Sequence, residues 1–166
     1  AERLTLVGRM LQRIDRTDDA IDCFERVVAL RPEDVGAHTI LGALLLERRE
    51  TERGIEHLDY AEAEGGNSGF LHHQLGLGQF RLCNLAGAIE RFRRAIERDP
   101  ATLAYRSSYL MALNYDDAIG AKALFEEHRR IMAPVNDALP VPLPFAAREP
   151  GARLRIGYVS ADFRAH

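Results

Sequence analysis

Small and apolar residues recur along this chain every 34 positions, and within each interval they follow the spacing of two helices. The clearest copy occupies residues 69–102, where Leu75 and Gly76 share the face of a first helix and Ala88 and Phe92 share the face of a second. The same positions recur in the two preceding intervals, at Leu41, Gly42, Gly54 and Leu58, and at Val7, Gly8, Ala20 and Phe24. This repetition predicts three antiparallel helix pairs, at 1–34, 35–68 and 69–102.

Glycine occupies the same phase of the first helix in all three predicted pairs, at Gly8, Gly42 and Gly76. A glycine inside a helix costs about 1 kcal/mol relative to alanine, so this recurrence indicates that neighbouring helices pack closely there. We also expect one bulky residue of each second helix to fill the space between successive repeats. These residues are Phe24, Leu58 and Phe92.

The ends of the predicted helices carry capping signals. Thr17, Thr51 and Asn84 are expected to cap the second helices, because their side-chain oxygens can accept a free backbone N–H of the first turn. Gly65 and Gly66 are expected to stop the second helix of the second pair, since glycine adopts the left-handed conformation without strain.

Residues 103–133 predict a fourth, degenerate helix pair. Tyr109 and Leu113 keep the phase of the first helix. The second helix matches the third repeat at an interval of 33, which predicts a one-residue deletion in the turn and packed positions at Ala121, Phe125 and His128. An atypical final unit is expected at the end of a solenoid, where the outer face meets a different neighbour.

Residues 134–152 break the helical pattern with five prolines and are predicted to form an extended, proline-rich connector. Residues 153–166 then begin with a short apolar run that predicts a buried strand. Ser160 and Asp162 follow in a predicted strand-to-helix loop, the kind of loop that binds ligands in open α/β sheets. One strand is not a domain, so we expect the sequence to be a fragment of a longer protein.

The 34-residue frame resembles the tetratricopeptide repeat. This resemblance implies a mainly α fold, in which the antiparallel helix pairs of residues 1–133 stack into an α-solenoid with a superhelical twist. Each pair cannot bury its apolar faces alone, so the repeats stabilise one another.

A second resemblance covers the junction after the repeats. The motifs are YLMALNY at 109–115, EHRR at 127–130, RIGYVS at 155–160, and Asp162-Phe163 followed by His166. They occur in the order that is found in O-linked N-acetylglucosamine transferases. In that family, tetratricopeptide repeats lead into a two-lobed, GT-B-like glycosyltransferase region, and residues 153–166 would be the first strand and loop of that region.

The second resemblance implies an activity for the parent protein. It would be an enzyme that transfers N-acetylglucosamine from UDP-GlcNAc to serine or threonine hydroxyls of proteins, with inversion and without a metal ion. The donor-binding lobe would lie beyond the sequence, so we expect the fragment alone to bind no cofactor and to be inactive. A different class of function stays open, which is a non-catalytic tetratricopeptide-repeat scaffold for protein–protein interaction.

His166 matches the histidine of the family's DFxxH motif. The resemblance implies an active-site role, either as a general base or as a group that orients the acceptor. Imidazole suits both roles, because its unperturbed pKa of ~6.5 leaves it largely neutral at physiological pH. The alternative is a loop residue without a catalytic part.

The concave face of the predicted superhelix carries a polar row and an apolar strip. The polar row consists of Thr5, Thr39, His73 and Ser107. The apolar strip consists of Ala43, Leu46, Leu77, Phe80 and Met111. Such a groove could bind an extended segment or a helix of an acceptor protein. The alternative is that the strip packs internally, against the connector or the remainder of the catalytic domain.

One feature of the eukaryotic transferases is absent from this face. Those members line the groove with an asparagine ladder that holds the backbone of a bound peptide. The corresponding positions here hold Leu6, Ile40, Gln74 and Ser108. This departure favours a bacterial-type member with a short repeat array.

Composition narrows the classes of partner. The 166 residues carry a net charge of −3, which predicts no broad attraction to nucleic acid or to an anionic membrane. No apolar run approaches the length of a membrane span. Cys23 and Cys83 lie outside any paired motif and are predicted to be reduced, which favours a cytoplasmic location.

The histidines within the repeats favour packing over metal binding. His72 and His73 are adjacent, so on a helix they point about 100° apart and cannot form a metal-binding pair. His38 and His72 recur at the repeat interval and are predicted to be packing residues. We therefore predict no metal site.

A cluster of arginines in the third repeat has two interpretations. It consists of Arg91, Arg93, Arg94 and Arg98. Glu90 and Glu97 are interleaved with it, which is typical of a solvated helix face. Phosphate binding is the less favoured alternative.

Overall fold

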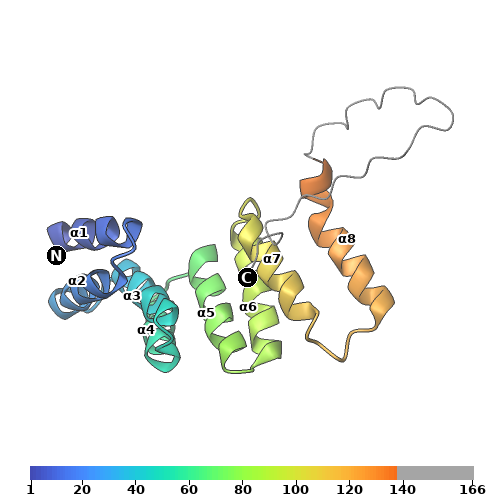
Figure 1. Ribbon diagram of the computed structural model, residues 1–166, viewed down its shortest axis with the longest axis horizontal. Helices are drawn as coiled ribbons and strands as arrows, with labels where there is room; N and C mark the ends of the chain where they lie inside the picture. The colour runs from blue at the N-terminus through green and yellow to red at the C-terminus, as the bar shows by residue number, and fades with distance from the viewer. Residues whose placement is uncertain (138–166) are drawn as a thin grey trace, which may run out of the picture.

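The computed structural model describes residues 1–137 and contains eight helices within that range (Figure 1). Their bounds are α1 (Glu2–Arg13), α2 (Thr17–Leu30), α3 (Val35–Glu47), α4 (Thr51–Ala63), α5 (Gly69–Arg81), α6 (Leu85–Arg98), α7 (Leu103–Leu113) and α8 (Ala121–Asp137). The predicted strand at 153–166, with its loop and His166, lies outside the described residues, as does most of the predicted connector.

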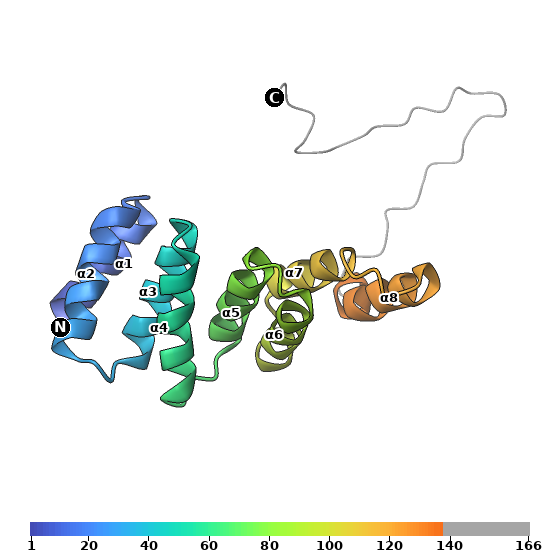
Figure 2. The ribbon, with the colours of Figure 1, turned by 90° about the horizontal axis from the view of Figure 1, so that it is seen from below.

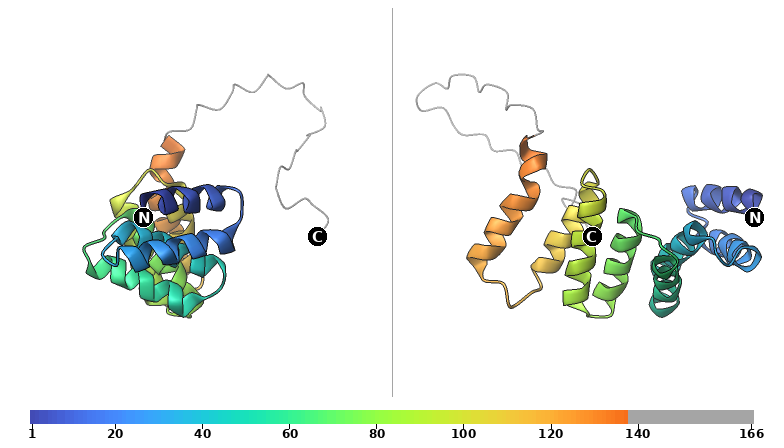
Figure 3. Two further views of the ribbon diagram at one scale, coloured as in Figure 1. Left: turned by 90° about the vertical axis from the view of Figure 1, so that its left-hand side faces the viewer. Right: turned by 180° about the vertical axis from the view of Figure 1, so that it is seen from behind.

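Consecutive helices pack as antiparallel pairs, and the pairs follow one another along a single axis (Figure 2). Helices α1 and α2 lie across the view of Figure 1, whereas α5 to α8 stand upright in it, so the pairs rotate along the axis. The views from the N-terminal end and from behind in Figure 3 show the same progression. The described residues therefore confirm the predicted mainly α solenoid with a superhelical twist.

Close contact between the two helices of each of the first three pairs is set by glycine. A Cβ atom on Gly42 would lie 2.6 Å from the Leu58 side chain and 2.7 Å from the carbonyl oxygen of Gly54. A Cβ atom on Gly76 would lie 2.6 Å from the ring of Phe92. These distances are shorter than real Cβ contacts, so no other residue fits there without moving a helix.

The bulky residues opposite the glycines fill the space between repeats, as predicted. Phe24, Leu58 and Phe92 are completely buried. Phe24 illustrates the arrangement, because its ring faces Gly8 of its own repeat and shares a core cluster with Leu41 of the next repeat. Each repeat thus depends on its neighbour for burial of its largest apolar side chain.

Helix α3 is enclosed on nearly all sides. It packs against α2, α4 and α5. Its buried residues are Ala37, His38, Thr39, Leu41, Gly42, Ala43, Leu44, Leu45 and Leu46. This enclosure leaves few side chains of α3 accessible to a partner.

The predicted caps are correct at one position and wrong at two. Asn84 caps α6, and its side-chain oxygen accepts from the Gly87 N–H at 3.1 Å. Thr17 and Thr51 are instead the first helical residues of α2 and α4, so their hydroxyls come one position too late to cap. The cap positions are held by Arg16 and Glu50, without a side-chain hydrogen bond to the helix end.

The turn within each of the first three pairs has one geometry. The middle turn residue is left-handed, with φ of 58° at Asp15, 64° at Arg49 and 59° at Cys83. The following backbone N–H reaches back into the first helix, as in the bond from Glu50 to Leu45 at 2.9 Å. Between repeats, Gly65 adopts φ of 88° and ends α4 as predicted.

The fourth pair differs from its predicted form. The turn before α8 has seven residues, 114–120, rather than the three that separate α5 from α6, so the predicted one-residue deletion is wrong. The longer turn changes the face that α8 buries. Phe125 is 62% exposed, whereas Ile131 is buried. Helix α8 also continues through Pro134 to Asp137, so helix extends past the predicted start of the connector.

Helix α8 is held by polar as well as apolar contacts. The Tyr109 hydroxyl donates to Glu127 at 2.7 Å, and burial together with this hydrogen bond raises the pKa of Tyr109 to about 12. Buried Arg106 donates to the carbonyl oxygen of Ile131 at 2.6 Å and to that of Pro100 at 3.0 Å. These contacts tie α8 to α7, the other helix of the fourth pair.

Substitution of Gly42 tests the close contact between helices. Gly42→Ala is expected to lower the free energy of unfolding by about 2 kcal/mol, because the new methyl group meets the backbone of Gly54 and the helices must separate. Gly36→Ala, on the exposed start of the same helix, is the control. There the nearest atom lies 3.3 Å from the new Cβ, so we expect a gain of up to about 1 kcal/mol.

Urea unfolding followed by circular dichroism measures both variants. An unchanged or increased stability of Gly42→Ala would show that the two helices are not in contact at this position.

Candidate functional site

The predicted polar row does not form a continuous surface. The Thr39 hydroxyl donates to the Val35 carbonyl of its own helix at 2.7 Å, and Thr5 makes the same type of contact to Ala1 at 3.3 Å. His73 turns toward the fourth repeat, where its Nε2 lies 2.9 Å from the Ser108 hydroxyl. Ser107 is exposed. The four residues are therefore divided between local bonds, an inter-repeat contact and solvent.

The apolar strip is buried at one end and open at the other. Ala43 and Leu46 are 3% and 1% exposed, so in this structure they pack internally and are not available to a partner. Leu77 and Phe80 are half-buried against the core around Phe92. Met111 is 40% exposed. Only the part of the strip on α5 and α7 remains a candidate for binding.

The open end of the strip continues into a pocket, here called the apolar turn pocket. It has a volume of about 330 Å³ and is lined by Phe80, Cys83, Leu85 and Tyr115. The rings of Phe80 and Tyr115 meet edge to face, with centroids 5.5 Å apart. Sequence reasoning found Phe80 but missed the other three. Their shared place, in the turn after a first helix or at the start of the following helix, was the available signal.

A second pocket, here called the charged turn pocket, lies in the corresponding place one repeat earlier. It has a volume of about 420 Å³ and is lined by Glu47, Arg49, Thr51 and Arg81. Arg81 donates to the carbonyl oxygen of Leu46. Burial raises the pKa of Glu47, although Arg81 opposes this shift. The pocket thus combines two cations with one weakened acid.

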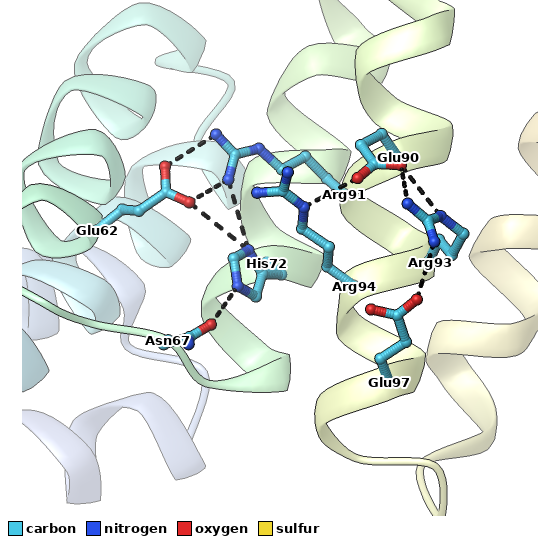
Figure 4. A network of polar contacts seen from close by, with 8 residues as sticks. All are labelled: Glu62, Asn67, His72, Glu90, Arg91, Arg93, Arg94 and Glu97. Atoms are coloured by element: carbon cyan, nitrogen blue, oxygen red, sulfur yellow. Dashed lines mark hydrogen bonds and ion pairs between the residues drawn. The ribbon is translucent and has the colours of Figure 1, made fainter.

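The arginines predicted to form a solvated face belong to a network that joins three helices (Figure 4). Arg91 reaches from α6 to Glu62 on α4, with one of its two hydrogen bonds at 2.9 Å. His72 of α5 lies beside this pair, with Nδ1 3.8 Å from Glu62, and its Nε2 faces the Asn67 side chain at 2.8 Å. The hydrogen bonds from Arg91 lower the pKa of Glu62, and burial lowers the pKa of His72.

The outer part of the same network is paired along α6. Arg93 bonds both Glu90 and Glu97, and Arg94 bonds Glu90. A pocket of about 410 Å³ beside it is lined by Glu62, Gly65, Gly66, Asn67, His72, Arg94, Glu97 and Arg98. Two carboxylates face two guanidiniums there, which favours the predicted solvated face over a phosphate site.

The histidines that recur at the repeat interval are structural, as predicted. His38 is 8% exposed and His72 is 3% exposed. His38 places Nε2 3.0 Å from the Pro32 carbonyl oxygen, so this nitrogen must carry the proton. His38 Nδ1 then accepts from Nδ1 of His57 at 3.0 Å. Burial, followed by His38 and Arg53, lowers the pKa of His57.

Residues 1–137 also bear on the predictions about groups of metal-ligating side chains and about helices that could span a membrane. No group of three metal-ligating side chains gathers within residues 1–137. No helix in that range has the length and hydropathy needed to cross a membrane. Cys23 and Cys83 are free thiols, the first half-buried and the second exposed. His166, the predicted catalytic residue, lies outside the described residues.

Residues 8–68 match the family model described as a tetratricopeptide repeat. No curated protein sequence matches the chain. Similarity beyond this family model therefore comes from solved structures.

Three solved structures illustrate these likenesses. A K341M mutant of Thermobaculum terrenum O-GlcNAc transferase is 24% identical, with a TM-score of 0.80, and the match covers 99% of this chain and 32% of the transferase. Residues 41 to the end of MamA from Desulfovibrio magneticus RS-1 are 23% identical, with a TM-score of 0.72 and coverage of 82% and 76%. The first tetratricopeptide-repeat domain of Spaghetti (RPAP3), bound to the HSP90 peptide SRMEEVD, is 17% identical, with a TM-score of 0.63 and coverage of 68% and 89%.

These matches show the fold. The tetratricopeptide-repeat α-solenoid predicted from the 34-residue interval is confirmed.

The His38–His57 contact predicts a pH-dependent stability. Because folding lowers the pKa of His57, the unfolded chain binds a proton more readily, so the free energy of unfolding falls as the pH drops below the unfolded pKa of ~6.5. His57→Gln is expected to show a smaller decrease between pH 7.5 and pH 5.5 than the original chain. Equal decreases in urea unfolding would exclude this contribution.

The Glu62 network predicts unequal effects of two neutralising substitutions. Glu62→Gln is expected to destabilise the fold by about 2 kcal/mol, because Arg91 and His72 lose a half-buried charged partner. Glu97→Gln removes only an exposed partner of Arg93 and is expected to change stability by less than about 0.5 kcal/mol. Thermal unfolding of the two variants makes the comparison, and equal effects would contradict a role for Glu62 in joining the repeats.

Proposed function

We propose that this chain is the acceptor-recognising repeat region, and the beginning of the catalytic region, of a UDP-GlcNAc-dependent protein O-GlcNAc transferase. The observation that carries the proposal is the structural likeness to the Thermobaculum terrenum transferase, which extends over nearly the whole chain. The RIGYVS motif at 155–160 and the Asp162, Phe163 and His166 motif support it.

The repeats bind acceptor proteins in this proposal. Two features of the described residues support such a role, namely the half-open apolar strip on α5 and α7 and the two turn pockets beside it. The repeat domain of Spaghetti, which shares this fold, is itself bound to a peptide. Extended segments suit such a surface, since side chains on one face of the segment can enter successive pockets.

The remainder of the catalytic domain supplies the donor site. UDP-GlcNAc is the donor substrate, and no metal ion takes part. His166 removes the proton of the acceptor serine or threonine, or orients its hydroxyl, as the oxygen attacks the anomeric carbon and UDP departs. Attack from the face opposite UDP inverts the configuration at that carbon. An imidazole with a pKa of ~6.5 is neutral enough to accept this proton at physiological pH.

A non-catalytic interaction scaffold is the second candidate function. It is favoured by the likeness of the same described residues to MamA and to the repeat domain of Spaghetti. The match to the transferase covers only 32% of that protein, so the two candidates differ in the part of the parent protein that lies C-terminal to the repeats.

Titration of UDP into the longest natural form of the protein distinguishes them. We expect calorimetric UDP binding both by the original protein and by His166→Ala, with sugar transfer reduced by about 10²–10⁴-fold in the variant. The 166-residue chain alone is expected to transfer no sugar. Absence of UDP binding by the longest form would favour the scaffold, and transfer by the 166-residue chain would overturn the assignment of the donor site.

A further inference from the structure

The two turn pockets are one architectural site that occurs twice. Three of the four residues lining each pocket occupy equivalent positions, 34 residues apart. The pairs are Arg49 and Cys83, Thr51 and Leu85, and Arg81 and Tyr115. The backbone geometry also repeats, because Arg49 and Cys83 both have the left-handed conformation, with φ of 64° and 59°. The pockets therefore lie one repeat apart along the same edge of the solenoid.

The apolar turn pocket lies among unusually exposed apolar side chains. Tyr115 is 64% exposed, Leu82 is 49% exposed and Met111 is 40% exposed. Phe80 and Leu85 are half-buried beside them. Side chains of this size remain in water only at an energetic cost of roughly 25 cal/mol per Å², and a pocket of about 330 Å³ accommodates a leucine or phenylalanine side chain.

The charged turn pocket offers guanidinium groups without a carboxylate partner. Within residues 1–137, neither Arg49 nor Arg81 forms an ion pair, whereas neighbouring Arg48 pairs with Asp18 at 2.8 Å. Both arginines are exposed. Free N–H donors on guanidinium bind a carboxylate by charge-assisted hydrogen bonds. Glu47 opposes this binding, because its carboxylate lines the same pocket.

The distance between repeats sets the spacing of a ligand that reaches both pockets. Packed neighbouring helices lie about 10 Å apart. An extended peptide in the polyproline II conformation rises about 3.1 Å per residue with three residues per turn, so side chains three positions apart share one face and are separated by about 9 Å. A partner segment can then place one side chain in each pocket.

We infer that this edge of the solenoid binds an extended protein segment that carries a leucine or phenylalanine and an aspartate or glutamate three positions apart. The apolar side chain enters the apolar turn pocket, and the carboxylate pairs with Arg49 and Arg81. This assignment rests on the proposed function, because it names the kind of protein segment that the repeats bind. Nucleic acid is disfavoured, since an apolar pocket without a neighbouring cation row does not follow a phosphate backbone.

Peptide binding to the 166-residue chain tests the assignment. The probes are two fluorescein-labelled libraries of ten-residue peptides, in which leucine is fixed three positions before or after glutamate and the other positions are glycine, serine or alanine. In the control library, lysine replaces glutamate. We expect at least about tenfold tighter binding of the glutamate library by fluorescence anisotropy, which is about 1.4 kcal/mol.

Matched variants locate the contact. Arg49→Gln is expected to weaken binding of the glutamate library about fivefold, whereas Arg48→Gln, which already has a partner, is expected to leave it unchanged. Tyr115→Ser is expected to weaken binding of both libraries, whereas Phe125→Ser, with a similar exposure of 62%, is expected to have no effect. Glu47→Gln is expected to strengthen binding of the glutamate library, because it removes the competing carboxylate.

The outcomes separate the two proposals. Binding of both libraries with equal affinity, or binding unaffected by Arg49→Gln and Tyr115→Ser, would overturn the assignment of the turn pockets while leaving protein binding by the repeats in place. Failure of the chain to bind either library at millimolar peptide would overturn the assignment and also the proposed recognition of extended acceptors.

Discussion

The close contact of two helices at a recurring glycine is the constraint on which the structure depends. Gly42 admits Leu58 and the backbone of Gly54 at distances that no Cβ atom would allow, and Gly76 admits the ring of Phe92 in the same way. Helices held this closely have one relative position. The next repeat must then pack on the surface that this position creates, so the geometry propagates from pair to pair.

A fixed backbone leaves each repeat free to change the chemistry of equivalent positions. One position places a buried polar side chain in three successive repeats, His38, His72 and Arg106, and two of these contact the carbonyl oxygen of a proline six residues earlier. At the edge of the solenoid, equivalent positions give a charged pocket and an apolar pocket. The sequence of pockets, rather than any single residue, is what distinguishes this surface from that of another protein with the same fold.

The fold was predictable because it rests on periodic residues. Gly8, Gly42 and Gly76 mark the 34-residue repeat, and their packing partners follow each of them at the same spacing in the sequence. The candidate site was predictable only in part. Burial of Leu46 depends on how α3 is enclosed by three other helices, and exposure of Phe125 depends on a turn lengthened to seven residues. Neither the enclosure of α3 by other helices nor the length of an irregular turn is encoded in a local pattern, so both were available only from the assembled structure.

Competition between the repeats and the whole enzyme is the most direct test of acceptor recognition. The longest natural form would be supplied with radiolabelled UDP-GlcNAc and protein acceptors, with increasing amounts of the 166-residue chain added. We expect the added chain to suppress incorporation of the sugar into protein, because it binds acceptors without transferring sugar, and to leave hydrolysis of UDP-GlcNAc in the absence of acceptor unchanged. Incorporation that persists at saturating amounts of the chain, or no incorporation at all, would contradict the proposed function.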